Sequence, residues 1–251
     1  MTQKPLILAV ETSAPIGSAA IALGEQTLAE VTFSGPMRHS AEIFPAVGDL
    51  LQRFARKPKD IEHIYISIGP GSFTGLRIAA ALAKTMHLAN ATRVVAVDTL
   101  DVIAANVINL TSTSDEQRLS AVASAKAEAT RDETIATILD AKRSQFFIAV
   151  YQRTSDGIWK KILPDSLMTA SQFIEKFAAP DKPVWLLGVG LVHHKEKFKT
   201  DGIRFLDKKY WNPRAEKVHL LGWKMAQAGQ FADPMTLTPL YLRKPDVKIK
   251  S

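Results

Sequence analysis

The sequence predicts an α/β protein with mixed sheets. Three short β-type segments come first, and helical and strand segments then alternate, an order typical of sheets that combine antiparallel with parallel strands. The length of 251 residues and the 46% content of hydrophobic residues are enough for one large domain or two small ones. A weakly periodic stretch at residues 110–132 favours two domains, with a boundary near it.

The first segments form a predicted meander. They are rich in Ile, Val and Ala and are separated by glycine-containing turns, and we expect strands at residues 6–10, 18–23 and 27–33. Apolar residues then recur at helical spacing over 40–56, with Ser40 as the expected N-cap. A strand at 63–68, a glycine-rich loop, a helix at 76–88, a strand at 93–97 and a helix at 99–108 complete this half.

The second half predicts a smaller α/β unit. We expect strand-like segments at 134–139, 145–152, 159–163 and 183–187, with helices at 170–177 and 215–228. The predicted domains are therefore residues 1–109, joined by the helix at 215–229, and residues 110–214. Residues 230–251 form a basic C-terminal segment.

Charge and cysteine content limit the function classes. The chain has no cysteine, which excludes disulfides, thiolate metal sites and a cysteine nucleophile. Residues 191–251 contain 13 basic and 6 acidic side chains, which accounts for the whole net charge of +7. This excess indicates either an acidic partner such as nucleic acid or a solvated, lysine-rich surface.

The termini and the longest apolar run bear on the location of the protein. The first residues do not resemble a signal peptide, and we expect a cytoplasmic protein. The apolar run at 184–192 has nine residues, whereas a membrane-spanning helix needs about 20. We therefore expect no contact with the membrane.

A glycine-rich loop and the end of the first strand are the candidate ligand site. A loop between a strand and a helix N-terminus presents free N–H groups that can bind an anion, although a purely structural turn explains the glycines equally well. A carboxylate and hydroxyls after the first strand could help to hold a metal–phosphate or could cap a turn. The candidate residues are Glu11, Thr12, Ser13, Gly69, Gly71, Ser72, Thr74 and Arg77.

Other catalytic and metal-binding signatures are missing from the sequence. The six histidines form neither H-x-x-x-H nor H-E-x-x-H, and no G-x-S-x-G or G-x-x-x-x-G-K-[ST] occurs. We expect no intrinsic metal centre and no catalytic residue. The helices at 40–56 and 76–88 predict an apolar layer that either covers the sheet or forms a protein interface. An interface is favoured because Ile78, Leu82 and Met86 add a second apolar stripe to the helix at 76–88, which is more than one sheet contact needs.

Six motifs together resemble the bacterial TsaB family, also called YeaZ. They are Ile7-Leu8-Ala9-Val10-Glu11-Thr12-Ser13, Arg38-His39-Ser40-Ala41-Glu42 with Pro45, the run from Gly69 to Arg77, Leu139-Asp140-Ala141-Lys142-Arg143, Gly188-Val189-Gly190 and Pro239-Leu240-Tyr241-Leu242-Arg243. The chain departs from the family pattern at Glu11, where aspartate is usual, and at Lys142 and Ser144, where arginine and glycine are common.

The resemblance implies an actin/Hsp70-like (ASKHA) fold of two related α/β domains. It also implies a non-catalytic subunit of the complex that forms N6-threonylcarbamoyladenosine at position 37 of tRNA. The implied partners are the catalytic paralogue TsaD and the ATPase TsaE, with a homodimer when the chain is alone and with ATP or ADP at the subunit junction. Direct contact with tRNA stays open.

The resemblance places the partner interface on the two helices of the first half. The implied interface residues are His39, Ile43, Phe44, Val47, Leu51, Gly75, Ile78, Ala79, Leu82, Ala83 and Met86. Two other hypotheses remain. One is an ATP-binding transferase or peptidase-like enzyme of the same superfold, and the other is a tRNA-binding module that uses the basic C-terminal segment.

Overall fold

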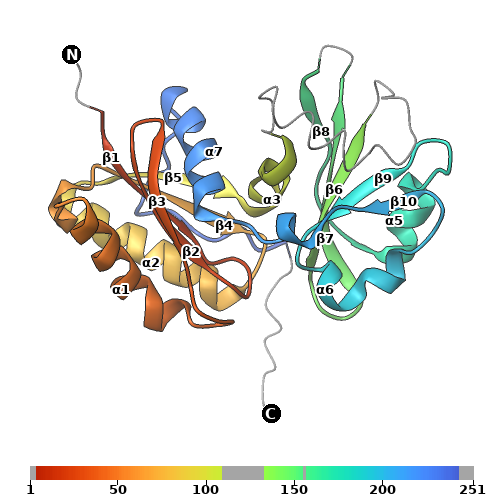
Figure 1. Cartoon of the computed structure of the whole chain (residues 1–251), viewed down its shortest axis with the longest axis horizontal. Helices are drawn as coiled ribbons and strands as arrows, with labels where there is room; N and C mark the ends of the chain where they lie inside the picture. The colour runs from red at the N-terminus through yellow and green to blue at the C-terminus, as the bar shows by residue number, and fades with distance from the viewer. Residues whose placement is uncertain (1–3, 109–132, 155–156, 243–251) are drawn as a thin grey trace.

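Two five-stranded sheets lie side by side in the computed structural model, which describes residues 4–108, 133–154 and 157–242 (Figure 1). The first sheet has the order β3-β2-β1-β4-β5, with strands at Leu6–Glu11 (β1), Ser18–Leu23 (β2), Gln26–Thr32 (β3), His63–Gly69 (β4) and Arg93–Asp98 (β5). The second has the order β10-β9-β6-β7-β8, with strands at Thr134–Asp140 (β6), Gln145–Arg153 (β7), Trp159–Thr169 (β8), Val184–Leu187 (β9) and Ile203–Phe205 (β10).

The two sheets have the same topology. In each, the first three strands form an antiparallel meander, and the fourth and fifth strands are added in parallel on the other side of the first strand. Parallel neighbours need crossover connections, and helices supply most of them. This repeated arrangement of mixed sheets flanked by helices confirms the predicted fold class.

Helices cover both faces of the first sheet. On one face lie α1 (His39–Arg53) and α2 (Phe73–Asn90), and on the other lie α3 (Thr99–Ile108) and α7 (Ala215–Gln227) (Figure 1). The second sheet carries α5 (Ala170–Phe177) and α6 (Leu191–His194). Short 3-10 turns occur at η1 (Pro58–Asp60), η2 (Lys195–Phe198) and η3 (Lys208–Tyr210).

Strand β1 shows why both faces of the first sheet are covered. All six of its residues are buried, because successive side chains point to opposite faces and each face has a helical layer. Leu8 and Val10 join the core under α1 and α2, whereas Ile7 and Ala9 join the core under α7.

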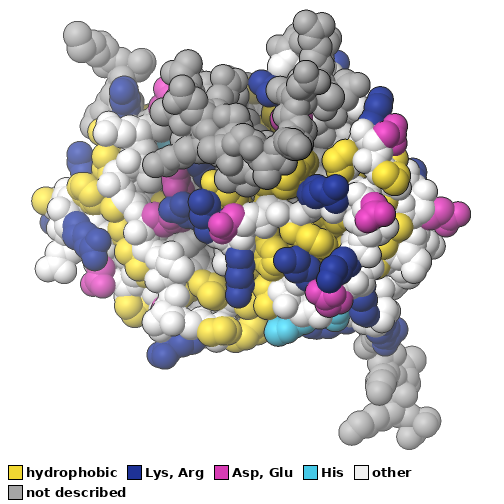
Figure 2. Space-filling model, turned by 45° about the vertical axis from the view of Figure 1, so that its right-hand side comes forward, with side chains coloured by type: hydrophobic (Ala, Val, Ile, Leu, Met, Phe, Trp, Pro, Cys, Tyr) yellow, Lys and Arg dark blue, Asp and Glu magenta, His cyan; other side chains and the backbone are white. Residues whose placement is uncertain are grey.

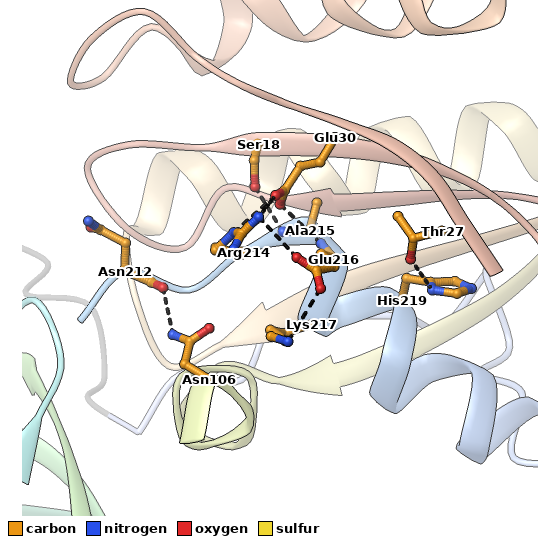
Figure 3. A network of polar contacts seen from close by, with 10 residues as sticks. All are labelled: Ser18, Thr27, Glu30, Asn106, Asn212, Arg214, Ala215, Glu216, Lys217 and His219. Atoms are coloured by element: carbon orange, nitrogen blue, oxygen red, sulfur yellow. Dashed lines mark hydrogen bonds and ion pairs between the residues drawn. The ribbon is translucent and has the colours of Figure 1, made fainter. Parts of the chain in front are cut away.

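A polar network holds α7 on the first sheet, and it joins the start of this helix to β2, a strand that lies almost 200 residues earlier in the sequence (Figure 3). The guanidinium of Arg214 pairs with Glu30, and the N–H of Ala215 donates to the Ser18 hydroxyl at 2.8 Å. Within α7, the ring of His219 lies 2.9 Å from the Thr27 hydroxyl and 2.8 Å from the Gly24 carbonyl oxygen. These contacts hold the helix against the β2–β3 hairpin.

Most predicted elements are present, with differences at a few ends. Helix α1 begins at His39 rather than after a Ser40 cap, and β8 continues to Thr169. Strand β10 and helix α6 were not predicted, because three and four residues are too short to show a period. The predicted connector at 110–132 lies outside the described residues. The predicted basic C-terminal segment, residues 230–251, is described only as far as Leu242.

Candidate functional site

The glycine-rich loop packs directly on the turn that follows β1. The N–H of Ser72 donates to the Ser13 carbonyl oxygen at 2.7 Å, and the Thr12 hydroxyl donates to the Gly75 carbonyl oxygen at 2.8 Å. A Cβ on Gly75 would lie 1.8 Å from the Thr12 carbonyl oxygen, and one on Gly71 would lie 2.5 Å from that of Ser13. The two glycines are therefore required for close contact within the chain.

The carboxyl group of Glu11 is enclosed by this packing. One of its oxygens accepts hydrogen bonds from the N–H and hydroxyl of Ser13, at 2.6 and 2.5 Å. Burial raises the pKa of Glu11, although the hydrogen bonds from Ser13 oppose the rise. Glu11, Thr12 and Ser13 are all buried, and among the described residues the second carboxylate oxygen of Glu11 has no hydrogen-bond partner.

The outer side of the same loop is exposed and aromatic. Thr74 and Arg77 are exposed, whereas Gly69 is buried and Ser72 caps α2 by accepting from the N–H of Gly75. The Arg77 guanidinium lies 3.8 Å from the centre of the Phe73 ring and donates to the Tyr241 hydroxyl at 3.3 Å.

This contact joins two motifs that are far apart in the sequence. The rings of Phe73 and Tyr241 are 5.3 Å apart, and the N–H of Leu240 donates to the Ile68 carbonyl oxygen at 2.7 Å. Both rings are exposed in part, at 43% and 37%. This pairing was not predicted, because the glycine run and the Pro-Leu-Tyr-Leu-Arg motif are separate features of the sequence.

The predicted partner interface needs correction. Seven of its residues are buried in the core of this chain and offer no surface to a partner: His39, Ile43, Leu51, Gly75, Ala79, Ala83 and Met86. They face the sheet, because the regular apolar spacing on each helix marks the side that packs on the core. Of the other four, Phe44 is 67% exposed, and Val47, Ile78 and Leu82 are half-buried.

Exposed apolar side chains nevertheless lie on and beside the outer sides of α1 and α2. Six of the nine large exposed hydrophobic side chains in the described residues lie on these helices, just before α1 or on the C-terminal segment: Met37, Phe44, Phe73, Leu88, Met235 and Tyr241. We call Phe44, Val47, Phe73, Ile78, Leu82 and Tyr241 the outer helical face. Exposed aromatic residues beside an arginine are the composition that protein interfaces favour.

A second polar cluster lies where the two sheets meet. The Lys161 ammonium on β8 is 2.9 Å from a carboxylate oxygen of Asp101, 2.5 Å from Asp165 and 3.5 Å from Asp98. The hydroxyl of Tyr151 donates to Asp101 at 2.6 Å. Burial, with the neighbouring Asp165 and Asp101, raises the pKa of Asp98 to about 8.

A cavity of about 300 Å³ adjoins this cluster rather than the glycine loop. Its lining includes Asp101, Tyr151 and Lys161 together with apolar residues of α3 and α7. The residues of the cluster come from four separate elements, and no sequence pattern indicated that they would meet.

Two further observations concern metal and membrane binding. Within residues 4–108, 133–154 and 157–242, no group of three His, Asp or Glu side chains is arranged to hold a metal ion. In the same part of the chain, no helix combines the length and the apolar character that crossing a membrane requires.

The fold and the motifs define a family. A sequence model of TsaD, described as tRNA N6-adenosine threonylcarbamoyltransferase, matches residues 28–183, which is more than half of the chain. The chain belongs to this family.

Two curated relatives within the family carry the same name. The chain is 29% identical to the tRNA threonylcarbamoyladenosine biosynthesis protein TsaB of Bacillus subtilis, over 97% of this chain and 96% of that one. It is 25% identical to the protein of the same name from Escherichia coli, over 83% and 82%. The solved structure of YeaZ from Pseudomonas aeruginosa has the same fold, with a TM-score of 0.73, 22% identity, and 95% and 100% coverage. The resemblance to the TsaB (YeaZ) family is confirmed.

Proposed function

We propose that this chain is a non-catalytic subunit in the biosynthesis of N6-threonylcarbamoyladenosine at position 37 of tRNA, and that it binds the catalytic paralogue TsaD. The outer helical face is the observation that carries the proposal. It carries an exposed Phe44 on α1, and on α2 it carries Phe73, whose ring lies with that of Tyr241 beside Arg77. Surfaces of this kind mark protein interaction sites.

The relationship between the chain and TsaD supports this choice of partner. Related proteins of one fold can pair through equivalent helices, much as a homodimer pairs through the same patch on both subunits. The same face would therefore serve a homodimer when the chain is alone. The ATPase TsaE would join the assembled complex at another surface.

The enclosed turn after β1 supports a non-catalytic role over an ATP-binding transferase or peptidase-like activity. Glu11 is buried and bonded to Ser13, so it is not placed to act on a substrate. Calorimetry of the purified chain with ATP tests this point, and a bound nucleotide with turnover would favour the enzyme alternative.

The experiment that tests the proposal compares two single variants. Phe44→Asp places a charge on the outer helical face, and Ile162→Asp places the same charge on β8, where the native side chain is 48% exposed. We expect Phe44→Asp to weaken binding to the cognate TsaD by about thirtyfold or more, as the loss of a hot-spot residue does, and Ile162→Asp to have little effect. The measurements are size-exclusion chromatography and tRNA modification with purified components. Full modification by TsaD alone, or equal effects of the two variants, would refute the proposal.

A further inference from the structure

The turn between β6 and β7 has an unusual backbone. Lys142, Arg143 and Ser144 all have positive φ values, of 65°, 52° and 57°. Residues other than glycine rarely adopt this conformation. Asp140 holds the turn, since its carboxylate accepts from the Lys142 N–H at 2.7 Å and from the Lys142 ammonium at 2.9 Å.

Basic residues from α6 and η2 converge on this turn. The Lys197 ammonium donates to the Ser144 hydroxyl at 3.2 Å, and the ring of His194 is 3.8 Å from the Asp140 carboxylate. Segments separated by about 50 residues thus form a single surface. We call it the basic turn surface, and it consists of Lys142, Arg143, His194, Lys195 and Lys197.

The charge of this surface is positive and accessible. The two segments that form it, residues 140–144 and 191–199, contain five Lys and Arg residues and two Asp and Glu residues. The side chain of Lys142 is 82% exposed, and Arg143, Lys195 and Lys197 are exposed as well. Figure 2 shows Lys and Arg side chains near the histidine side chains at the lower edge of the molecule.

We propose that the basic turn surface binds the phosphate backbone of the tRNA that the complex modifies. This inference rests on the proposed function, which supplies the RNA. Phosphates are recognised by lysine, arginine and backbone groups without any need for an apolar contact.

The composition of the surface favours RNA over a protein partner. Among the exposed large hydrophobic side chains of the described residues, only Val192 lies on α6 or the β6–β7 turn. The outer helical face has the opposite composition, with several aromatic and aliphatic side chains. The two faces therefore suit two different partners.

The test measures tRNA affinity against salt concentration. The first variant combines Lys142→Gln, Arg143→Gln and Lys197→Gln. The matched control combines Arg53→Gln, Arg56→Gln and Lys59→Gln, which removes the same charge from exposed positions in the first half. A third variant, with Lys142→Arg, Arg143→Lys and Lys197→Arg, preserves the charge. Fluorescence anisotropy with an unmodified tRNA transcript is recorded for the chain alone and for its complex with TsaD.

We expect the first variant to bind tRNA about tenfold to a hundredfold more weakly at 0.1 M salt, with the slope of log K against log salt reduced by about 2 to 3. The control and the charge-preserving variant should bind almost as the native chain does. Equal losses in the first variant and the control, or an unchanged slope in the first variant, would overturn the inference, and so would binding of an acidic protein there instead of RNA. Chromatography with TsaD reports separately on the proposed function, because the outer helical face is intact in all three variants.

Discussion

Replacing Lys161 by methionine tests whether the polar cluster between the two sheets stabilises the fold. Methionine keeps most of the apolar stem but removes the ammonium that contacts Asp98, Asp101 and Asp165. The three carboxyl groups would then lie close together without this cation. We expect the variant to be less stable than the native chain.

The magnitude follows from the burial of the cluster. Removing one partner of a fully buried ion pair costs about 3–5 kcal/mol, but the Lys161 side chain is 26% exposed and that of Asp101 is 39% exposed. Solvent screening lowers the expected loss to about 2–3 kcal/mol. For a chain of this size, that corresponds to a fall of about 5–10 °C in Tm.

The loss should depend on pH in a defined direction. The raised pKa of Asp98 means that the folded chain binds this proton more tightly than the unfolded chain, so stability falls as pH rises from about 4 to about 8. Without the ammonium of Lys161, the pKa of Asp98 rises further and the decline continues above pH 8. The destabilisation of Lys161→Met should therefore be larger at pH 9 than at pH 7.

The assay is thermal unfolding by circular dichroism at the two pH values. Lys160→Met is the matched control, because the neighbouring Lys160 is exposed and the change removes the same charge. We expect the control to stay within about 0.5 kcal/mol of the native chain. A Lys161→Met variant as stable as this control, or one with a smaller loss at pH 9 than at pH 7, would show that the reasoning is wrong.

Three further predictions concern backbone contacts and buried groups. Gly75→Ala should lower the free energy of unfolding in urea by about 3 kcal/mol or more, because the new Cβ would meet the Thr12 carbonyl oxygen. The control is Gly48→Ala, where a Cβ would have no atom within 4 Å, and this change should raise the free energy of unfolding by less than about 1 kcal/mol. Burial lowers the pKa of His219, so the unfolded chain binds the proton more tightly and the stability from this group should be lost as pH falls through about 6.5. The urea midpoint should fall less between pH 7.5 and pH 5 in a His219→Gln variant. Tyr241→Phe should cost less than about 1 kcal/mol, because the hydroxyl bond to the guanidinium is exposed.

The order of elements could be predicted because local signals were strong. Alternating Ile, Val and Ala residues located β1, β2 and β3, and apolar residues at helical spacing located α1 and α2, within a few residues of their ends. The same spacing misled the interface prediction. It identifies the side of a helix that is apolar along its length, and in α1 and α2 this is the side that packs on the sheet.

The candidate site was less predictable because it depends on contacts between distant segments. Phe73 and Tyr241 meet across 168 positions, and Lys161 meets Asp98 across 63. The environment of Glu11 also depends on such packing, since the glycine loop that covers it lies about 60 residues away. A pattern in one stretch of sequence contains no information on these distances.

The two sheets share one strand order, but the helices that connect their strands differ in size. The connection from the third to the fourth strand holds the 15 residues of α1 in one sheet but the 8 residues of α5 in the other. The next connection holds the 18 residues of α2 in one and only the single turn of α6, followed by η2, in the other. The crossover helices α5 and α6 of the second sheet are shorter than α1 and α2, so they offer a partner less helical surface than α1 and α2 do.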